Sequence, residues 1–169
     1  GYGFREESLH DAVAAGVDLI AADAGSSDPG PYYLGTGKPF VGEAMTKRDL
    51  KLLVKAGYDS GAPLIIGSAG GAGGDAQVDF LVRLLKEVMA ELNITRKVAV
   101  VRTELDKAMV QDALADQRIQ TFETNHPLSP DDIEQSAHIV AQMGCEAYWP
   151  ALRQEPDIII GGRAWDVAN

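Results

Sequence analysis

Four short stretches of the sequence hold the side chains best suited to acid–base chemistry and anion binding, and each directly follows a run of apolar residues. These stretches are residues 23–30, 67–75, 102–106 and 161–166. Carboxylates in them can act as general acids or bases or bind Mg²⁺, and an arginine guanidinium can hold a carboxylate or phosphate through two parallel hydrogen bonds. The residues that we predict to act in catalysis are Asp23, Asp28, Glu104 and Arg163.

The strongest signal for ligand binding is residues 64–75, LIIGSAGGAGGD, with five glycines in the eight positions from 67 to 74. Residues 64–66 suit a buried strand, and apolar residues recur at helical spacing from 76 to 92, so the glycines lie on a strand-to-helix turn. Glycine lets a ligand approach the backbone, and a helix N-terminus offers free N–H groups to an anion. Asp75, the expected N-cap, and Asp79 oppose a bare anion there unless a metal or a basic residue intervenes.

The predicted ligand-binding residues are small or polar and lie in or beside the same turns. They are Ser26, Gly67, Ser68, Gly70, Gly71, Gly73, Gly74, Asp75, Gly162 and Asp166. The sequence identifies no metal, but Asp23 and Asp28 would be the ligands if Mg²⁺ binds. Gly71, Gly73 and Ala76 fit a relaxed dinucleotide-binding spacing, but a run with so many glycines matches this spacing easily by chance. No Lys-Ser or Lys-Thr follows the glycines, so the run is not a Walker A loop.

The elements that must position these residues alternate between strands and helices. Strands are predicted at 17–22, 64–66, 97–101, 118–123 and 157–160, and helices at 6–15, 46–58 (capped by Thr46), 76–92, 107–115, 129–143 or 144, and 148–154. This order predicts an α/β fold with a mainly parallel sheet and helices on both faces, a Rossmann-like three-layer arrangement. Because ligands bind at the carboxyl ends of parallel strands, the four stretches should share one edge.

Three histidines and one long connection complete the candidates. His138 falls on the predicted helix 129–143, where we expect a solvated surface position, and His126 follows the predicted strand 118–123 as the histidine best placed for catalysis. No two histidines have the helical spacing of a metal site. Residues 32–43 are predicted to form an irregular loop that has a function, since long connections without secondary structure are usually functional.

The composition describes one globular domain of 169 residues, with 46% hydrophobic and 24% charged residues. The net charge of −10, with no basic cluster longer than Lys47-Arg48, argues against nucleic acid and acidic membrane as partners. No window reaches the apolar length of a membrane span, and no signal peptide is visible. A single cysteine, Cys145, cannot form an internal disulfide and fits a reducing compartment, so we expect a cytoplasmic protein.

The segments IAADAGSSDPGPYYLGTGKPF, PLIIGSAGGAGGD, HIVAQMG and DIIIGGRAWD resemble the amino-terminal part of the acyclic terpene utilisation (AtuA-like) family. Members of that family are longer and begin with another strand. The resemblance therefore implies that residues 1–169 are a single α/β domain, a fragment of a longer protein that lacks the first strand and the carboxyl-terminal part.

The resemblance implies a part in the breakdown of acyclic terpenoids such as citronellol and geraniol, beside enzymes of branched acyl-CoA thioesters, and some members carry a lyase label. Our first hypothesis is an enzyme domain that acts on a branched carboxylate or acyl-CoA by lyase, hydratase or hydrolase chemistry, with coenzyme A as part of the substrate. The alternative is a non-catalytic binding or scaffold subunit of an acyl-CoA-processing complex. A third reading is a dinucleotide-binding oxidoreductase, for which Glu104 lies too far beyond Gly73. The sequence does not determine the oligomeric state, and a homo-oligomer is one of the possibilities.

Overall fold

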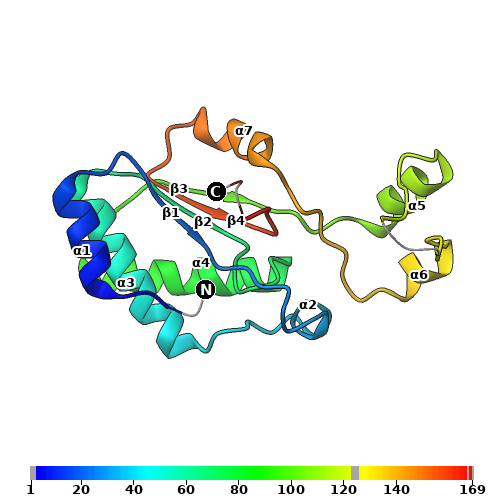
Figure 1. The fold of residues 1–169 in the computed structure, drawn as a ribbon, viewed down its shortest axis with the longest axis horizontal. Helices are drawn as coiled ribbons and strands as arrows, with labels where there is room; N and C mark the ends of the chain where they lie inside the picture. The colour runs from blue at the N-terminus through cyan, green and yellow to red at the C-terminus, as the bar shows by residue number, and fades with distance from the viewer. Residues whose placement is uncertain (1–2, 123–125, 167, 169) are drawn as a thin grey trace.

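The computed structural model describes residues 3–122, 126–166 and 168, and its centre is a four-stranded sheet in which every strand pairs in parallel (Figure 1). The strands are β1 (Ile20–Asp23), β2 (Leu64–Gly67), β3 (Val98–Val101) and β4 (Ile158–Gly161). Their order across the sheet is β1-β2-β4-β3. The α/β class and the parallel sheet are therefore confirmed.

Helices α1 (Glu6–Ala15), α3 (Glu43–Ser60) and α4 (Asp75–Leu92) cover one face of the sheet (Figure 1). Alternate residues of the two central strands, Leu64 and Ile66 in β2 and Ile158 and Ile160 in β4, belong to the core on this side. The helices meet them with apolar residues at helical spacing: Leu50, Leu53, Val54, Val78, Leu81, Leu84, Leu85 and Val88. The period of two in the strands and of 3.6 in the helices brings these side chains together in one layer.

The opposite face of the sheet carries a smaller core. Ile65 and Ile159, the intervening residues of β2 and β4, pack there with Met143, Tyr148 and Ala151. This layer is built by the 3-10 helix η1 (Cys145–Tyr148) and by α7 (Trp149–Leu152), which correspond to the helix predicted at 148–154. Helical structure therefore lies on both faces, and the three-layer prediction is confirmed.

Two helices stand apart from the sheet. Figure 1 shows α5 (Lys107–Ala115) and α6 (Pro130–Gln135) together at one end of the molecule, beyond the carboxyl ends of the strands. Asp106 caps α5 by accepting hydrogen bonds from two backbone amides, and Ser129 begins α6 with a capping box. No helix in the part of the chain that the structure describes is both long enough and apolar enough to cross a membrane.

Two predicted elements in the second half of the chain are wrong. The described part of the predicted strand 118–123, residues 118–122, forms no strand, and Glu123 lies outside the described residues. The helix predicted from 129 to 143 ends at Gln135. Beyond it, the Leu105 amide donates to the Ile139 carbonyl at 2.8 Å and the Ala141 amide to the Thr103 carbonyl at 2.8 Å, so pairing with another loop replaces helical hydrogen bonds.

Smaller differences lie at helix starts. Residues Tyr32–Thr36 form a short helix, α2, inside the stretch predicted as irregular. Helix α3 begins at Glu43 with Gly42 as its N-cap, and the Thr46 hydroxyl donates to the Gly42 carbonyl at 3.2 Å instead of capping. Gly74, and not Asp75, is the N-cap of α4.

Candidate functional site

The four chemically rich stretches meet at the carboxyl edge of the sheet, which we call the rim. The Ser26 amide donates to the Gly71 carbonyl at 3.3 Å, and the Ser68 amide donates to the Gly162 carbonyl at 2.9 Å. The Gly162 amide in turn donates to the carbonyl of Val101, the last residue of β3, at 2.8 Å. The loops after all four strands are thus joined through their backbones, as the parallel sheet requires.

The glycines of the rim allow its loops to pack closely against one another. Gly73 has a φ of 74°, and a Cβ at this position would overlap the backbone of Arg163. The Thr103 hydroxyl lies 3.4 Å from the Gly73 carbonyl and accepts a hydrogen bond from the Arg163 amide at 2.7 Å. A Cβ at Gly162 would overlap the Thr103 hydroxyl. Thr103 is only 6% exposed, so it ties three loops together from inside.

Ser68 is fully buried, with a φ of 51°. Its hydroxyl accepts a hydrogen bond from the Ala164 amide at 3.2 Å and lies 3.4 Å from the Ala164 carbonyl, to which it donates. Both contacts connect the loop after β2 with the loop after β4. The hydroxyl therefore has a structural part in the rim, and its ligand-binding part stays a prediction.

Arg163 presents a half-buried positive charge at the centre of the rim. Its guanidinium Nη1 donates to the Gly71 carbonyl at 3.3 Å. A Cβ at Gly25 would lie 2.9 Å from the same nitrogen, so the guanidinium rests directly on that glycine. Among the described residues, no acidic side chain comes within the 4.0 Å of Arg163 that defines an ion pair. Its remaining N–H groups can hold a carboxylate or a phosphate.

The two aspartates after β1 differ in position. Asp23 is half-buried, and its Oδ1 accepts a hydrogen bond from the Gly25 amide at 3.0 Å. Asp28 is exposed, and its amide donates to the Ser26 hydroxyl at 3.3 Å. Across the described ranges, no three side chains of His, Cys, Asp or Glu gather into a group that could hold a metal ion. That Asp23 and Asp28 would hold Mg²⁺ stays a prediction.

A largely apolar pocket of about 420 Å³ lies along β1. Its walls come from the loop before α1 and from α1, β1, α3 and α4, and include Phe4, Leu9, Ile20, Leu50, Leu53 and Leu81. At the rim end the lining contains Asp23, Ala24 and Gly70. Ala24 and Gly70 directly precede Gly25 and Gly71, two glycines that lie against the Arg163 guanidinium. The pocket therefore reaches the edge at which the polar groups collect.

Arg102 pairs with the two acids near the start of α4, Asp75 and Asp79. Its Nη1 lies 3.3 Å from Asp75 Oδ1, a distance that makes an ion pair without hydrogen-bond geometry, and its Nη2 bonds Asp79 Oδ1. The hydrogen bond with Asp79 and the weaker interaction with Asp75 raise the pKa of Arg102 against the effect of partial burial. Arg102 is thus the basic residue that the acids at this helix start require.

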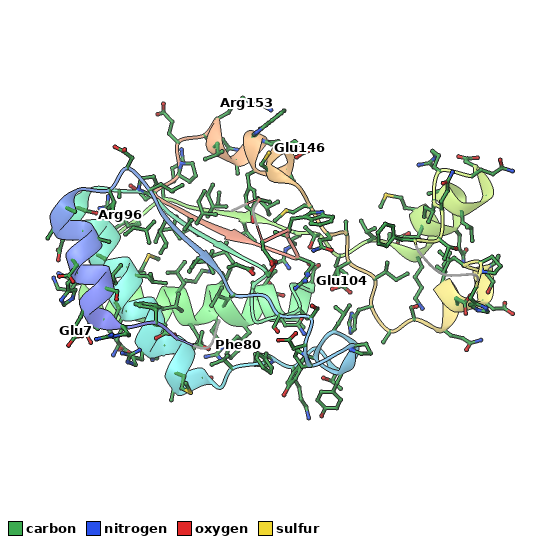
Figure 2. The ribbon with its side chains drawn as sticks, in the orientation of Figure 1. Glu7, Phe80, Arg96, Glu104, Glu146 and Arg153 are labelled. Atoms are coloured by element: carbon green, nitrogen blue, oxygen red, sulfur yellow. The ribbon has the colours of Figure 1, made fainter. Side chains whose placement is uncertain are left out.

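Glu104 lies against the start of α4 and contacts His138, which the sequence pattern predicts to lie on a solvated helix surface. Figure 2 shows Glu104 at the end of α4 nearest α2. Its Oε2 accepts a hydrogen bond from the Asp75 amide at 2.7 Å, and its Oε1 lies 2.6 Å from Nδ1 of His138. Partial burial alone would raise the pKa of Glu104, but hydrogen bonds from His138 and from the Asp75 amide outweigh it, so this pKa lies below its usual value.

His138 is the site residue that the sequence analysis missed. It begins an extended segment, residues 138–143, which we call the strap. The strap pairs with the loop after β3 and ends where the Met143 amide donates to the Arg163 carbonyl at 3.1 Å. No local pattern marks this segment, because the helix signal at Ser129 continues through it; only its partners in the sheet loops reveal it.

The ligand-binding roles of the other predicted residues also stay predictions. Asp166 is exposed, and Gly67 is the last residue of β2. The Gly70 carbonyl accepts a hydrogen bond from the Phe40 amide at 2.8 Å, which holds the segment after α2 against the rim. His126 is exposed and is the first described residue after the gap at residues 123–125.

Comparison with known proteins gives one result for this chain. The family model described as "Acyclic terpene utilisation family protein AtuA" matches residues 48–169, which include three of the four strands and the loops after them. No curated protein and no solved structure matches the chain. Since the match spans most of the sequence, the chain belongs to the acyclic terpene utilisation family.

Proposed function

We propose that this chain is an enzyme domain that acts on a branched, apolar carboxylate or its acyl-CoA thioester in acyclic terpenoid catabolism, by lyase, hydratase or hydrolase chemistry. The observation that carries the proposal is the apolar pocket of about 420 Å³ whose lining ends at Asp23 on the rim. Its volume falls in the range of small-molecule sites, and such sites combine apolar walls with a few polar groups. A branched hydrocarbon chain suits the walls, and a carboxylate or thioester suits the rim.

Arg163 supports the polar half of the proposal. Its guanidinium has no ion-pair partner among the described acidic residues and lies on glycines next to the pocket lining. An unpaired, half-buried cation is costly unless something satisfies it, and an anionic ligand would do so. Because the whole chain carries a net charge of −10, such a ligand must be held by local donors.

The non-catalytic alternative is supported by a different surface. Trp149 is 54% exposed and Leu152 is 46% exposed, both on α7, and Trp165 near the end of the chain is 58% exposed. Large exposed apolar side chains can mark a protein partner. A scaffold subunit should also have its rim acids paired, as Asp75, Asp79 and Glu104 are. The unpaired Arg163 and the pocket favour the enzyme. The dinucleotide reading gains no support, because both carboxylate oxygens of Glu104 are already hydrogen-bonded.

The test is thermal unfolding of the purified chain with isovalerate, isovaleryl-CoA, coenzyme A and acetate. A ligand at 100 times its dissociation constant should stabilise the protein by about 2.7 kcal/mol. We expect isovalerate or its thioester to stabilise the wild type more than acetate does, since acetate leaves the apolar pocket empty. Arg163→Gln should abolish the shift.

Arg153→Gln is the matched control, because Arg153 is an exposed arginine on the far side of the sheet from α4 (Figure 2). Its variant should bind like the wild type. The proposal fails if none of the branched compounds stabilises the wild type, or if Arg163→Gln responds to them as the wild type does.

A further inference from the structure

The side chains of Glu104 and His138 link the rim to the strap. The two residues are 34 positions apart, and Nδ1 of His138 lies 2.6 Å from Oε1 of Glu104. The side chain of His138 is 31% exposed and that of Glu104 is 22% exposed, so water competes only partly with the bond. The second oxygen of Glu104 is held at 2.7 Å by the Asp75 amide.

This arrangement determines which nitrogen of His138 carries a proton. A carboxylate accepts hydrogen bonds, and the lowered pKa of Glu104 keeps it ionised, so Nδ1 must be the donor. In the neutral imidazole, Nε2 is then left with its lone pair available to accept a proton. Nε2 makes no hydrogen bond or ion pair with any residue in the described part of the chain.

The pair belongs to segments that are hydrogen-bonded to the backbone of Arg163. Glu104 follows Thr103, which accepts the hydrogen bond from the Arg163 amide, and the strap that begins at His138 ends on the Arg163 carbonyl. A Cβ at Gly74 would lie 3.3 Å from Glu104 Oε2 and 3.1 Å from Leu34 of α2, so the pair lies where α2 meets the start of α4. His138 and the Arg163 cation are therefore attached to the same joined loops.

We infer that His138 is the acid–base group of the rim and that Glu104 is the residue that positions it. Nε2 accepts the proton from an O–H or C–H group of the bound ligand or of a water molecule beside it. The proton then passes from the imidazolium to the leaving group or the product, which regenerates the neutral ring, and water is the co-reactant that hydratase or hydrolase chemistry consumes. This assignment rests on the proposed function for the identity of the ligand, and it changes the part of Glu104 from catalytic carboxylate to positioning residue.

The test observes the imidazole directly and needs no substrate. In protein labelled with ¹⁵N at histidine, neutral His138 should show the chemical shifts of a protonated Nδ1 and a bare Nε2, with exposed His10 as the internal reference. Diethyl pyrocarbonate should then acylate His138 at Nε2. A neutral His138 with its proton on Nε2, or a His138 that resists the reagent under conditions that acylate His10, would overturn the inference.

Two variants separate positioning from mere structural support. Glu104→Gln replaces one of the two acceptor oxygens with an NH₂ group, which donates and cannot accept from Nδ1, so His138 should lose its uniform Nδ1-protonated tautomer. Glu134→Gln removes an exposed acid of α6 and should leave the His138 signals unchanged. If Glu104→Gln keeps the wild-type tautomer, Glu104 does not position the ring. Because the wild-type spectrum is decisive without any ligand, a failure here is distinct from a failure of isovalerate to bind.

Discussion

The backbone of Arg163 occupies the space that a side chain at Gly73 would need. A Cβ at residue 73 would collide with the amide nitrogen and Cα of Arg163, and Gly73 also has a φ of 74°. The loop after β2 and the loop after β4 can therefore approach this closely only with glycine at this position. Through this contact the turn before α4 determines where the Arg163 guanidinium lies.

Gly73→Ala should destabilise the protein by more than about 3 kcal/mol, because the strained backbone of a non-glycine residue adds to a clash that only movement of the loops relieves. Gly30 is the control, since it has a φ of 67° and nothing within 4 Å of an added Cβ. Gly30→Ala should cost only about 1 kcal/mol. Urea unfolding of both variants measures the difference, and equal losses would contradict the packing argument.

The Tyr148 phenol should make stability fall at alkaline pH. Burial, with the negative charge of Asp23 adding to its effect, raises the pKa of Tyr148 from 10.0 to about 12. A raised pKa means that the folded state holds the proton more tightly, so this stability is complete below pH 10 and is lost as the pH rises through about 12. Two units correspond to roughly 3 kcal/mol.

Tyr148→Phe should remove that loss, so the difference between the variant and the wild type should shrink or reverse as the pH rises above 10. Urea unfolding across this range measures the effect, with phenolate absorbance following the ionisation. A wild-type profile parallel to that of Tyr148→Phe would show that the buried phenol does not govern alkaline stability.

Glu104 should contribute stability with the opposite dependence on pH. Its hydrogen bonds with His138 and the Asp75 amide, working against partial burial, lower its pKa from 4.5. The contribution is therefore present above pH 4.5 and is lost as the pH falls through the lower folded-state value. Glu104→Gln should be less stable than the wild type at neutral pH, and the gap should narrow in acid. Thermal unfolding from neutral pH to below 4.5 measures the gap, and a gap independent of pH would refute this prediction.

The core between the sheet and α4 should be the main source of stability. Leu84 is completely buried in this core, and Leu84→Ala should lower the free energy of unfolding by about 2–5 kcal/mol, since the surroundings cannot fill the cavity. Leu152, on α7, is 46% exposed, and Leu152→Ala should cost well under half as much. Urea unfolding compares them. Similar losses would mean that α7 packs more tightly than its exposure indicates.

Local patterns in the sequence were enough to predict the strands that build the sheet and the helices beside them. Two examples are the apolar residues 64–66 followed by glycines and the apolar stripe from Val78 to Val88. Such patterns predict buried faces from the periodicity of strands and helices alone. The alternation of strands and helices then placed Asp23, Glu104 and Arg163 on one edge, because parallel strands end together. The Thr103 hydroxyl joins the loops of Glu104 and Arg163 there, and the bonds of Ser68 and of the Ser26 amide connect the glycine turn to the loops of Arg163 and Asp23.

Only the tertiary structure decided which of these residues act on one another. The helix signal at Ser129 is real, but it extends too far, because extended pairing of residues 139–141 with residues 103–105 competes with helix beyond Gln135. That pairing moves His138 from an expected solvated helix surface to Glu104, 34 positions away. Propensity is a local property of the chain, whereas a contact over this separation depends on how all the intervening elements pack. The sequence therefore determined the sheet and its edge, and the packing of the strap against the rim determined the pair that we assign to proton transfer.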